Sequence, residues 1–319
     1  MDYPINLSVV IPLYNEAESL QELYDWIRRV VEAHQITTEV IFVDDGSTDS
    51  SWQVITTLSN QHPNVHGVRF ARNYGKSPAL HVGFQKAQGA VVITMDADLQ
   101  DSPDEIPELY NMVCNQGYDL VSGWKKKRFD PLSKTLPTKL FNATARYFSG
   151  VKLHDFNCGL KAYRHEVVKS LELYNDMHRF IPYMAKLQGF GKITEKVVAH
   201  RARPYGKSKF GLDRFVNGYL DLLVLWFTGK YGRKPMHFFG LLGSLMFFAS
   251  FIALAVLLLH KFIALRHGIS APLVASTPYF YLCLTGIILG VQLFLAGFLG
   301  ELLARQSPTR DRYTIREQL

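Results

Sequence analysis

Two long runs without a charged side chain lie in the last third of the 319-residue chain. Phe238–Leu259 and Tyr279–Gly300 contain no Lys, Arg, Asp or Glu. A run of about 22 residues extends roughly 33 Å as a helix, which is enough to cross the hydrocarbon core of a bilayer. Two buried helices of a soluble bundle would keep a polar face on at least one of them, and neither run has one. The sequence therefore predicts two transmembrane helices.

The basic residues around these runs predict how the chain is oriented. Cytoplasmic flanks of membrane spans are enriched in Lys and Arg. Leu7–Ile11 is too short to be the apolar core of a signal peptide, and no basic segment precedes it. We therefore expect a multi-pass protein of the inner membrane, with both termini and the first two hundred residues in the cytoplasm. Lys230, Arg233 and Lys234 precede the first run, Arg305, Arg310, Arg312 and Arg316 follow the second, and Lys261 and Arg266 lie between them.

Composition excludes several other classes of protein. The formal net charge is +7, but juxtamembrane Lys and Arg account for a basic chain, and no nucleic-acid-binding motif is present, so we expect no nucleic-acid partner. The three cysteines, Cys114, Cys158 and Cys283, show no C-x-x-C spacing. This pattern fits a reducing compartment and argues against a structural zinc or a disulfide framework.

The first 125 residues alternate short β-branched runs with helical patterns. Such alternation is typical of an α/β fold with a parallel sheet and helices on both of its faces. In these sheets ligands bind at the carboxyl ends of the strands. The predicted strands are Leu7–Ile11, Val40–Val43, Val65–Phe70 and Ala90–Met95, and the predicted helices are Glu16–Glu32, Ser47–Leu58 and Pro78–Ala87.

Polar clusters follow three of the predicted strands. They are Tyr14–Glu16, Asp44–Ser47 and Asp96–Asp98. One such cluster could arise by chance, whereas three at the same edge of one sheet indicate a site.

The stretch "MDADLQDSP" (95–103) suggests a metal site. In an extended chain Asp96, Asp98 and Gln100 would point to one face, and oxygen ligands without Cys or His suit Mg²⁺ or Mn²⁺. Ser102–Glu105 is interpreted as a helix start, with Ser102 as N-cap and Glu105 closing a capping box. Asp101 could belong either to this cap or to the site.

Two segments near the predicted spans look amphipathic. Residues 209–229 carry apolar side chains every three or four positions opposite polar ones, which is typical of a helix in the membrane interface. Residues 134–149 show the same pattern more weakly, and packing against the soluble domain explains them equally well.

Several stretches together resemble glycosyltransferase family two, and within it the polyprenyl-phosphate glycosyltransferases. The resemblance implies a GT-A, Rossmann-like domain that binds a nucleotide sugar. The segment "SGWKKKRF" departs from the pattern, because Trp124 and Lys125 stand where the family has a small residue and an arginine. The matching stretches are "VVIPLYNE" (9–16), "EVIFVDDGSTDSS" (39–51), "RNYGKSPAL" (72–80), "MDADLQDSPDEIPEL" (95–109) and "RPYGKSKF" (203–210).

The resemblance also assigns roles to residues of this chain. It implies that Asp98, Asp155, Arg203 and Lys209 serve catalysis, and that Asp96, Asp98 and Gln100 hold Mg²⁺ or Mn²⁺. Asp155 would orient a sugar hydroxyl or act as a base, unless it merely caps a loop. The implied donor-binding residues are Pro12, Tyr14, Glu16, Asp44, Asp45, Asp96 and Ser208. Independently of the resemblance, basic side chains near the membrane are expected to attract the acceptor phosphate electrostatically, and the residues expected to do so are Lys125, Arg128, Lys139 and Arg146. For the run at 125–128, a solvated or lipid-facing charge cluster is an equally good explanation.

The expected function is inverting transfer of one sugar from a nucleotide donor, a UDP-sugar such as UDP-glucose, to polyprenyl phosphate at the cytoplasmic face, in glycosylation or cell-envelope synthesis. The enzyme is expected to form a homo-oligomer. A GDP-mannose-dependent synthase remains an alternative. Transfer to a protein or glycan, a lipid-linked sugar flippase and a membrane scaffold are further alternatives. The expected domains are 1–208 (catalytic), 209–234 (juxtamembrane), 235–304 (transmembrane) and 305–319 (tail).

Overall fold

The computed structural model describes residues 3–126, 132–174, 176–201, 204, 213–232, 234–268 and 273–306. Side chains are described for all of these except 132–140, 213–217 and 305. The chain divides into two compact units, Met1–Leu223 and Val224–Leu319. The domain boundary predicted near residue 208 stays a proposal.

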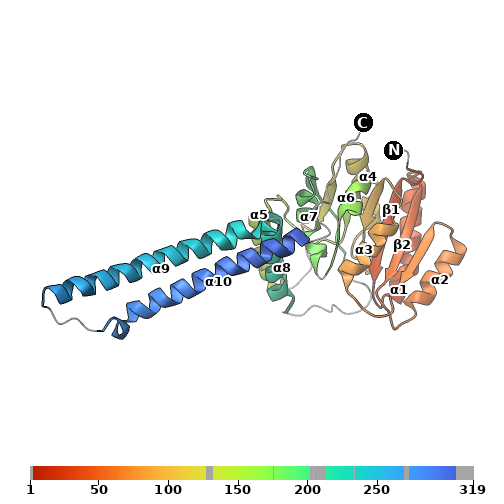
Figure 1. Ribbon diagram of the computed structural model, residues 1–319. Coiled ribbons are helices and arrows are strands. Elements are labelled where there is room, and N and C mark those ends of the chain that lie inside the picture. Colours follow the sequence, from red (N-terminus) through yellow and green to blue (C-terminus); the bar gives the residue numbers. More distant parts are fainter. Residues whose placement is uncertain are drawn as a thin grey trace. The chain divides into compact units, whose positions relative to one another are not determined.

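The first unit is built on a seven-stranded sheet in the order β3-β2-β1-β4-β6-β5-β7 (Figure 1). The strands β1 to β4 are mutually parallel, as the sequence predicts, whereas β6 runs antiparallel to both β4 and β5. The sheet is therefore mixed, a feature without a signal in the sequence pattern. The strands are β1 (Leu7–Leu13), β2 (Thr38–Asp44), β3 (Val65–Arg69), β4 (Val91–Thr94), β5 (Leu120–Trp124), β6 (Lys161–Arg164) and β7 (Ile193–Val197).

Helices cover both faces of this sheet and bury one apolar cluster on each. The first face carries α1 (Ala17–Ala33), α2 (Ser51–Gln61) and α4 (Ile106–Cys114). The opposite face carries α3 (Lys76–Lys86), α6 (His165–Ser170) and α7 (Ile181–Leu187). Because β1 and β2 lie inside the sheet and are covered on both faces, all their residues are buried and apolar side chains dominate them. Three short 3-10 turns complete the described elements: η1 (Pro103–Glu105), η2 (Met177–Phe180) and η3 (Val274–Ser276).

Two further helices match the predicted amphipathic segments, and the second of them continues from the first unit into the second. The helix α5 (Leu132–Ser149) buries Phe141 and Ala145 in the domain but leaves Tyr147 83% exposed. The helix α8 (Asp213–Tyr231) buries Leu222 and leaves Leu220 and Leu223 about half exposed. Each helix therefore packs on one side and presents apolar side chains on another, as interfacial helices do.

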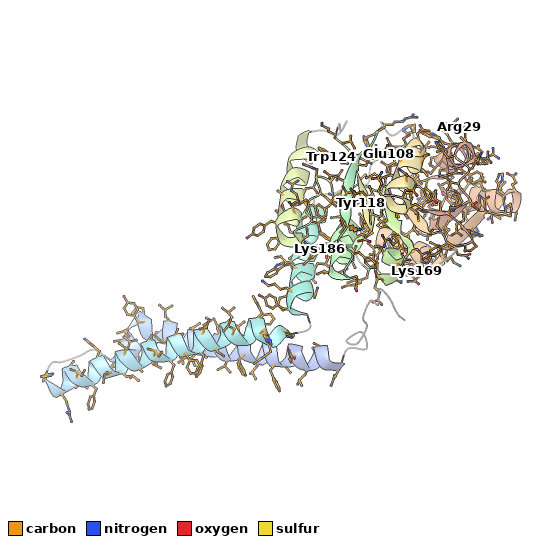
Figure 2. The ribbon with its side chains drawn as sticks, turned by 90° about the horizontal axis from the view of Figure 1, so that it is seen from above. Arg29, Glu108, Tyr118, Trp124, Lys169 and Lys186 are labelled. Atoms are coloured by element: carbon orange, nitrogen blue, oxygen red, sulfur yellow. The ribbon has the colours of Figure 1, made fainter. Side chains whose placement is uncertain are left out.

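The second unit consists mainly of α9 (Pro235–Arg266) and α10 (Pro278–Gln306), which lie side by side in Figure 1. Residues Pro235–Arg266 and Pro278–Ala304 are long and apolar enough to cross a membrane, with mean hydropathies of 2.5 and 2.2. Figure 2 shows side chains standing out along the length of both helices, and many of these are exposed leucines and phenylalanines. Exposed apolar surface on this scale is expected of helices that contact lipid.

Candidate active site

Three polar loops meet at one edge of the sheet. The strands β2, β1 and β4 are neighbours, and their register pairs Leu13 with Asp44 and Val10 with Thr94. Because the three strands are parallel, the loops that follow them, Tyr14–Glu16, Asp44–Ser47 and 95–100, emerge on the same side. The structure thus brings together the three clusters that the sequence singles out.

Hydrogen bonds join the loops after β1 and β2. The Asn15 backbone N–H donates to Ser47 Oγ (2.9 Å), and the Thr48 N–H donates to Asn15 Oδ1 (2.8 Å). The Glu16 N–H donates to Ser51 Oγ (3.0 Å). Asn15 adopts a left-handed conformation (φ 56°), which Asn tolerates better than most residues. Of the proposed donor-binding residues on these loops, Pro12 is buried in β1, and Tyr14 and Glu16 are half-buried.

Asp44, the last residue of β2, and Asp45, which follows it, have separate structural partners. Asp44 is fully buried, accepts from the Ser47 N–H (2.7 Å) and lies 3.5 Å from Arg69 Nε. Asp45 accepts from the backbone N–H groups of Tyr74 (2.7 Å) and Gly75 (2.8 Å). Burial raises the pKa of Asp45 even though these two donors oppose the shift. Asp45 thus fixes the segment that leads into α3, whose first residue is Lys76.

The chain after β4 is a turn. The strand ends at Thr94, residues 97 and 98 form a turn, and Leu99 adopts φ 59°. The prediction that Asp96, Asp98 and Gln100 alternate along an extended chain is therefore wrong. The Asp98 side chain instead folds back and accepts from the Gln100 backbone N–H (3.2 Å). A local hydrogen bond of this kind favours a turn over continuation of the strand.

Asp96 forms an ion pair with Lys76, the first residue of α3. Desolvation raises the pKa of Asp96, but the charges of Lys76 and Lys125 outweigh it, and the pKa is lowered. Gly159 lies against the same carboxylate, since a Cβ atom built there would stand 2.4 Å from Asp96 Oδ2. Asp96 is thus enclosed by an ammonium group and by a loop whose backbone approaches closely.

Asp101 and Lys125 form an ion pair in the interior. Asp101 is fully buried, and Lys125 Nζ lies 2.7 Å from its Oδ1. Burial of Lys125 disfavours its charge, but the nearby Asp101 carboxylate more than compensates, and the pKa of Lys125 is raised. The ammonium proposed as an acceptor-phosphate ligand is therefore turned toward a carboxylate of its own chain.

The segment after Asp101 begins a 3-10 turn. Ser102 accepts from the Asp104 N–H, which confirms Ser102 as N-cap, with Pro103 first in the turn. The predicted capping box is wrong, because the Glu105 side chain instead contacts Lys196 and accepts from the Ala199 N–H. Glu105 therefore interacts with residues that are distant in the sequence, and not with the backbone N–H of Ser102 that a capping box would use.

Asp155 lies in a loop that α5 holds in place. Asn142 donates to the His154 carbonyl (2.9 Å), and Arg146 donates to the Leu153 carbonyl (3.3 Å). Asp155 itself is buried, and its Oδ1 accepts from the Asn157 N–H (3.0 Å). This bond matches the loop-capping interpretation. Arg146 therefore contacts the backbone of this loop, and Gly159, a few residues further along the chain, lies against Asp96.

A small pocket lies beside Asp96 and carries three basic side chains. They are Lys76 from α3, Lys161 from β6 and Arg179 from η2. None of the three is among the site residues predicted from the sequence, although Lys76 lies in the matching stretch "RNYGKSPAL". Lys161 and Arg179 lie outside the matching stretches, and the fold brings them beside Lys76.

Five of the proposed site residues lack side-chain descriptions. Arg128, Arg203, Ser208 and Lys209 lie outside the described residues, and Lys139 lies in the part of α5 whose side chains are not described.

Comparison with known proteins gives matches along nearly the whole chain. Residues 8–172 match the model of "Glycosyl transferase family 2". The dodecaprenyl-phosphate galacturonate synthase of Rhizobium johnstonii is 34% identical over 94% of this chain and 88% of its own length. An undecaprenyl-phosphate 4-deoxy-4-formamido-L-arabinose transferase of Pectobacterium carotovorum is 35% identical over 98% of this chain and 93% of its own.

Solved structures with the same fold include glucosyl-3-phosphoglycerate synthase from Mycobacterium tuberculosis in complex with Mn²⁺, UDP-glucose and phosphoglyceric acid. Its TM-score is 0.52 at 21% identity, with 71% of this chain and 80% of that chain covered. The GT-A-like fold expected from the motifs is thereby confirmed. The chain belongs to glycosyltransferase family 2.

Proposed function

We propose that this glycosyltransferase transfers one sugar from a UDP-sugar to polyprenyl phosphate at the cytoplasmic face of the inner membrane. The observation that carries the proposal is the juxtaposition, at one edge of the sheet, of Asp96 and Asp98 with a pocket lined by basic side chains. The two aspartates suit a cation that binds the diphosphate of a nucleotide sugar. The basic side chains of the pocket suit an acceptor that carries a phosphate.

The acceptor needs little activation. The second pKa of a phosphate monoester is about 6, so the lipid phosphate is largely dianionic at neutral pH and already nucleophilic. The main barrier is the separation of the nucleoside diphosphate from the anomeric carbon. In-line attack inverts that carbon and gives a β-linked product from an α-linked donor. Asp155 would orient a sugar hydroxyl or assist as a base.

The oxygen atoms at the sheet edge fit a divalent cation. Asp96, Asp98 and Gln100 would hold it, and the Asp96 carboxylate already neutralises one cation, the Lys76 ammonium. Among the described residues no three His, Cys, Asp or Glu side chains form a complete metal site. Mg²⁺ and Mn²⁺ take some of their ligands from substrate phosphates, so the protein itself needs to supply only one or two carboxylates. When bound, such an ion neutralises charge developing on the departing diphosphate.

The membrane segments suit a lipid acceptor. An isoprenoid tail stays in the bilayer, so the active site has to reach the headgroup plane. The exposed leucines of α8 and the two apolar helices support such attachment. The relatives named above act, by their names, on dodecaprenyl or undecaprenyl phosphate, and they cover the second unit of this chain as well as the first.

The first test replaces Asp98 by Asn. We expect transfer of radiolabelled sugar to polyprenyl phosphate to fall by about 100-fold or more, because loss of one group that stabilises developing charge has effects of this size. A chelator should abolish wild-type transfer, and Mn²⁺ should restore it. Undiminished activity of Asp98→Asn would refute the role of this carboxylate.

A matched control is Asp25→Asn, which makes the same chemical change on an exposed side chain of α1 that pairs with Arg28. It should leave transfer unchanged. Product formation without polyprenyl phosphate would indicate a different acceptor. Movement of preformed lipid-linked sugar across vesicles without nucleotide would indicate a flippase.

The donor is tested by thermal unfolding with a panel of nucleotide sugars and Mn²⁺. A ligand that binds only the native state raises the unfolding temperature by mass action. We expect a UDP-sugar to stabilise the protein selectively. Selective stabilisation by GDP-mannose would overturn the choice of nucleotide.

A further inference from the structure

The segment 199–201, which follows β7, lies beside the chain that carries the proposed metal ligands. The Arg201 backbone N–H donates to the Gln100 carbonyl (2.9 Å), and His200 forms an antiparallel bridge with Asp101. Residues 100 and 101 are far from residues 200 and 201 in the sequence, so only the folded domain brings them together. The segment therefore acts as a short backbone support for the chain at residues 100 and 101.

Gln100 in turn holds Asp98. The Gln100 backbone N–H donates to the Asp98 carboxylate (3.2 Å), while its carbonyl accepts from Arg201. Leu99, which lies between the two proposed ligands, is buried and adopts φ 59°. A left-handed conformation is unfavourable for leucine and persists only where the surrounding structure holds it in place. The turn that presents Asp98 and Gln100 therefore depends on contacts from outside the turn.

The Arg201 side chain anchors the segment to a helix. Its guanidinium lies over the ring of Trp26, a residue of α1, with 4.3 Å between Arg201 Cζ and the ring centroid. Trp26 is 8% exposed and belongs to the apolar cluster on that face of the sheet, whereas Arg201 is exposed. A guanidinium group in this position is attracted by the negative face of the indole ring. The stack therefore ties a surface segment to the core of the domain.

Trp26 also contacts the chain that follows the proposed ligands. Its Nε1–H donates to Asp104 Oδ1 (2.8 Å), and Asp104 belongs to η1. In the same 3-10 turn, Glu105 accepts from the Ala199 N–H (3.0 Å). The segment 199–201 and η1 are thus joined to each other, and both are joined to Trp26.

We infer that Arg201 is a positioning residue of the metal site. By stacking on Trp26 it holds the segment 199–201 against Gln100, and Gln100 holds the Asp98 carboxylate. Loss of the stack lets the turn move, so that the ligands are less well placed and the divalent cation binds more weakly. The inference rests on the metal site of the proposed function, to which it adds a residue that acts through its neighbours.

The first experiment measures Mn²⁺ binding to the full chain in detergent, from the electron paramagnetic resonance signal of free Mn²⁺. Arg201→Met removes the guanidinium and keeps an unbranched side chain. We expect the dissociation constant for Mn²⁺ to rise about fivefold, because the free energy of a cation–π contact at a partly exposed site corresponds to a factor of about this size. Unchanged Mn²⁺ binding would overturn the inference.

Arg201→Lys tests whether the contact with the ring matters. Lysine keeps a positive charge that can lie over the indole, so Mn²⁺ binding should return to within about twofold of the wild type. If Arg201→Lys binds Mn²⁺ as weakly as Arg201→Met does, the stack on Trp26 does not position the site.

Trp26→Leu removes the other half of the contact. In this background Arg201→Met should weaken Mn²⁺ binding no further, because two residues that act through one contact have non-additive effects. Additive losses in the double variant would show that the two residues act independently and would contradict the inference. If thermal unfolding shows that Trp26→Leu does not fold, the two Arg201 variants decide alone, because Arg201 is exposed and tolerates substitution.

Transfer kinetics separate positioning of the cation from a direct role in the reaction. Arg201→Met should need about fivefold more Mn²⁺ for its half-maximal rate, and it should approach the wild-type rate when Mn²⁺ is saturating. A lower maximal rate that added Mn²⁺ cannot restore would assign Arg201 to another step and overturn the inference.

Arg266→Met is the matched control. Arg266 also stacks on an aromatic ring, that of Phe262 (5.4 Å), but it belongs to the second unit. This variant should bind Mn²⁺ as the wild type does, and weaker binding would show that the effect is not specific to Arg201. A wild type that transfers sugar while Arg201→Met binds Mn²⁺ normally would reject this inference and leave the proposed function intact. A wild type that binds no Mn²⁺ would overturn both.

Discussion

Gly159 shows how a residue without a side chain can shape the site. Its backbone passes so close to Asp96 that a Cβ atom would stand between 2.4 and 2.8 Å from three atoms of the carboxyl group. The Gly159 carbonyl also accepts from Thr94 Oγ1 (2.8 Å), so the loop is fastened to β4. Since the loop has little freedom to retreat, an added methyl group must displace the carboxylate.

Gly159→Ala should therefore lower transfer by about 10- to 100-fold, the usual effect of misplacing a functional group by about an ångström. The apparent affinity for the divalent cation should fall with it. Gly191→Ala is the control, because nothing lies within 4 Å of its Cβ position. Equal activity of both variants would show that the position of Asp96 does not limit the reaction.

At the scale of elements, α9 and α10 approach each other through glycines. A Cβ atom on Gly290 would lie 2.7 Å from the Phe247 nitrogen and 2.8 Å from the Gly243 carbonyl oxygen. These are backbone atoms, which cannot rotate away. Small residues that let two backbones come together are a common means of packing helices in a bilayer, where no hydrophobic effect drives association.

Gly290→Ala should destabilise this helix pair. Alanine in place of glycine favours a helix by about 1 kcal/mol, but overpacking costs about 1–3 kcal/mol, and here backbone must move. We expect a lower unfolding temperature by circular dichroism in detergent. Gly286→Ala meets the Ser250 side chain, which can rotate, and should cost less. If Gly286→Ala were the more damaging variant, close backbone packing would not hold the pair together.

At the scale of the whole molecule, the proposed orientation means that the nucleotide sugar is consumed at the cytoplasmic side of the membrane. In sealed inverted inner-membrane vesicles, added nucleotide sugar should be consumed without permeabilisation. In right-side-out vesicles it should be consumed only after detergent is added. The reverse pattern would place the first unit outside the cytoplasm and contradict the basic-residue argument.

Local sequence patterns were sufficient to predict much of the secondary structure of this protein. The strands β1 to β4 and the helices between them follow from hydrophobic periodicity, and the two apolar helices follow from the absence of charge over about 22 residues, a length set by the bilayer. The three polar loops at one sheet edge follow from parallel strands, whose carboxyl ends must coincide. In each case the structure is determined by residues close together in the sequence, or by the thickness of the bilayer that surrounds the helix.

Tertiary structure decided what depends on contacts between distant segments. The antiparallel β6, the turn at residues 97 and 98 and the partner of Glu105 were not predictable from local patterns. The basic pocket joins residues 76, 161 and 179, and the direction of the Lys125 ammonium depends on a buried aspartate 24 positions earlier, at 101. Composition and spacing determine which charged and polar side chains the chain contains and where they lie along it. The free energy of burying charge determines which of these side chains contact one another in the folded protein.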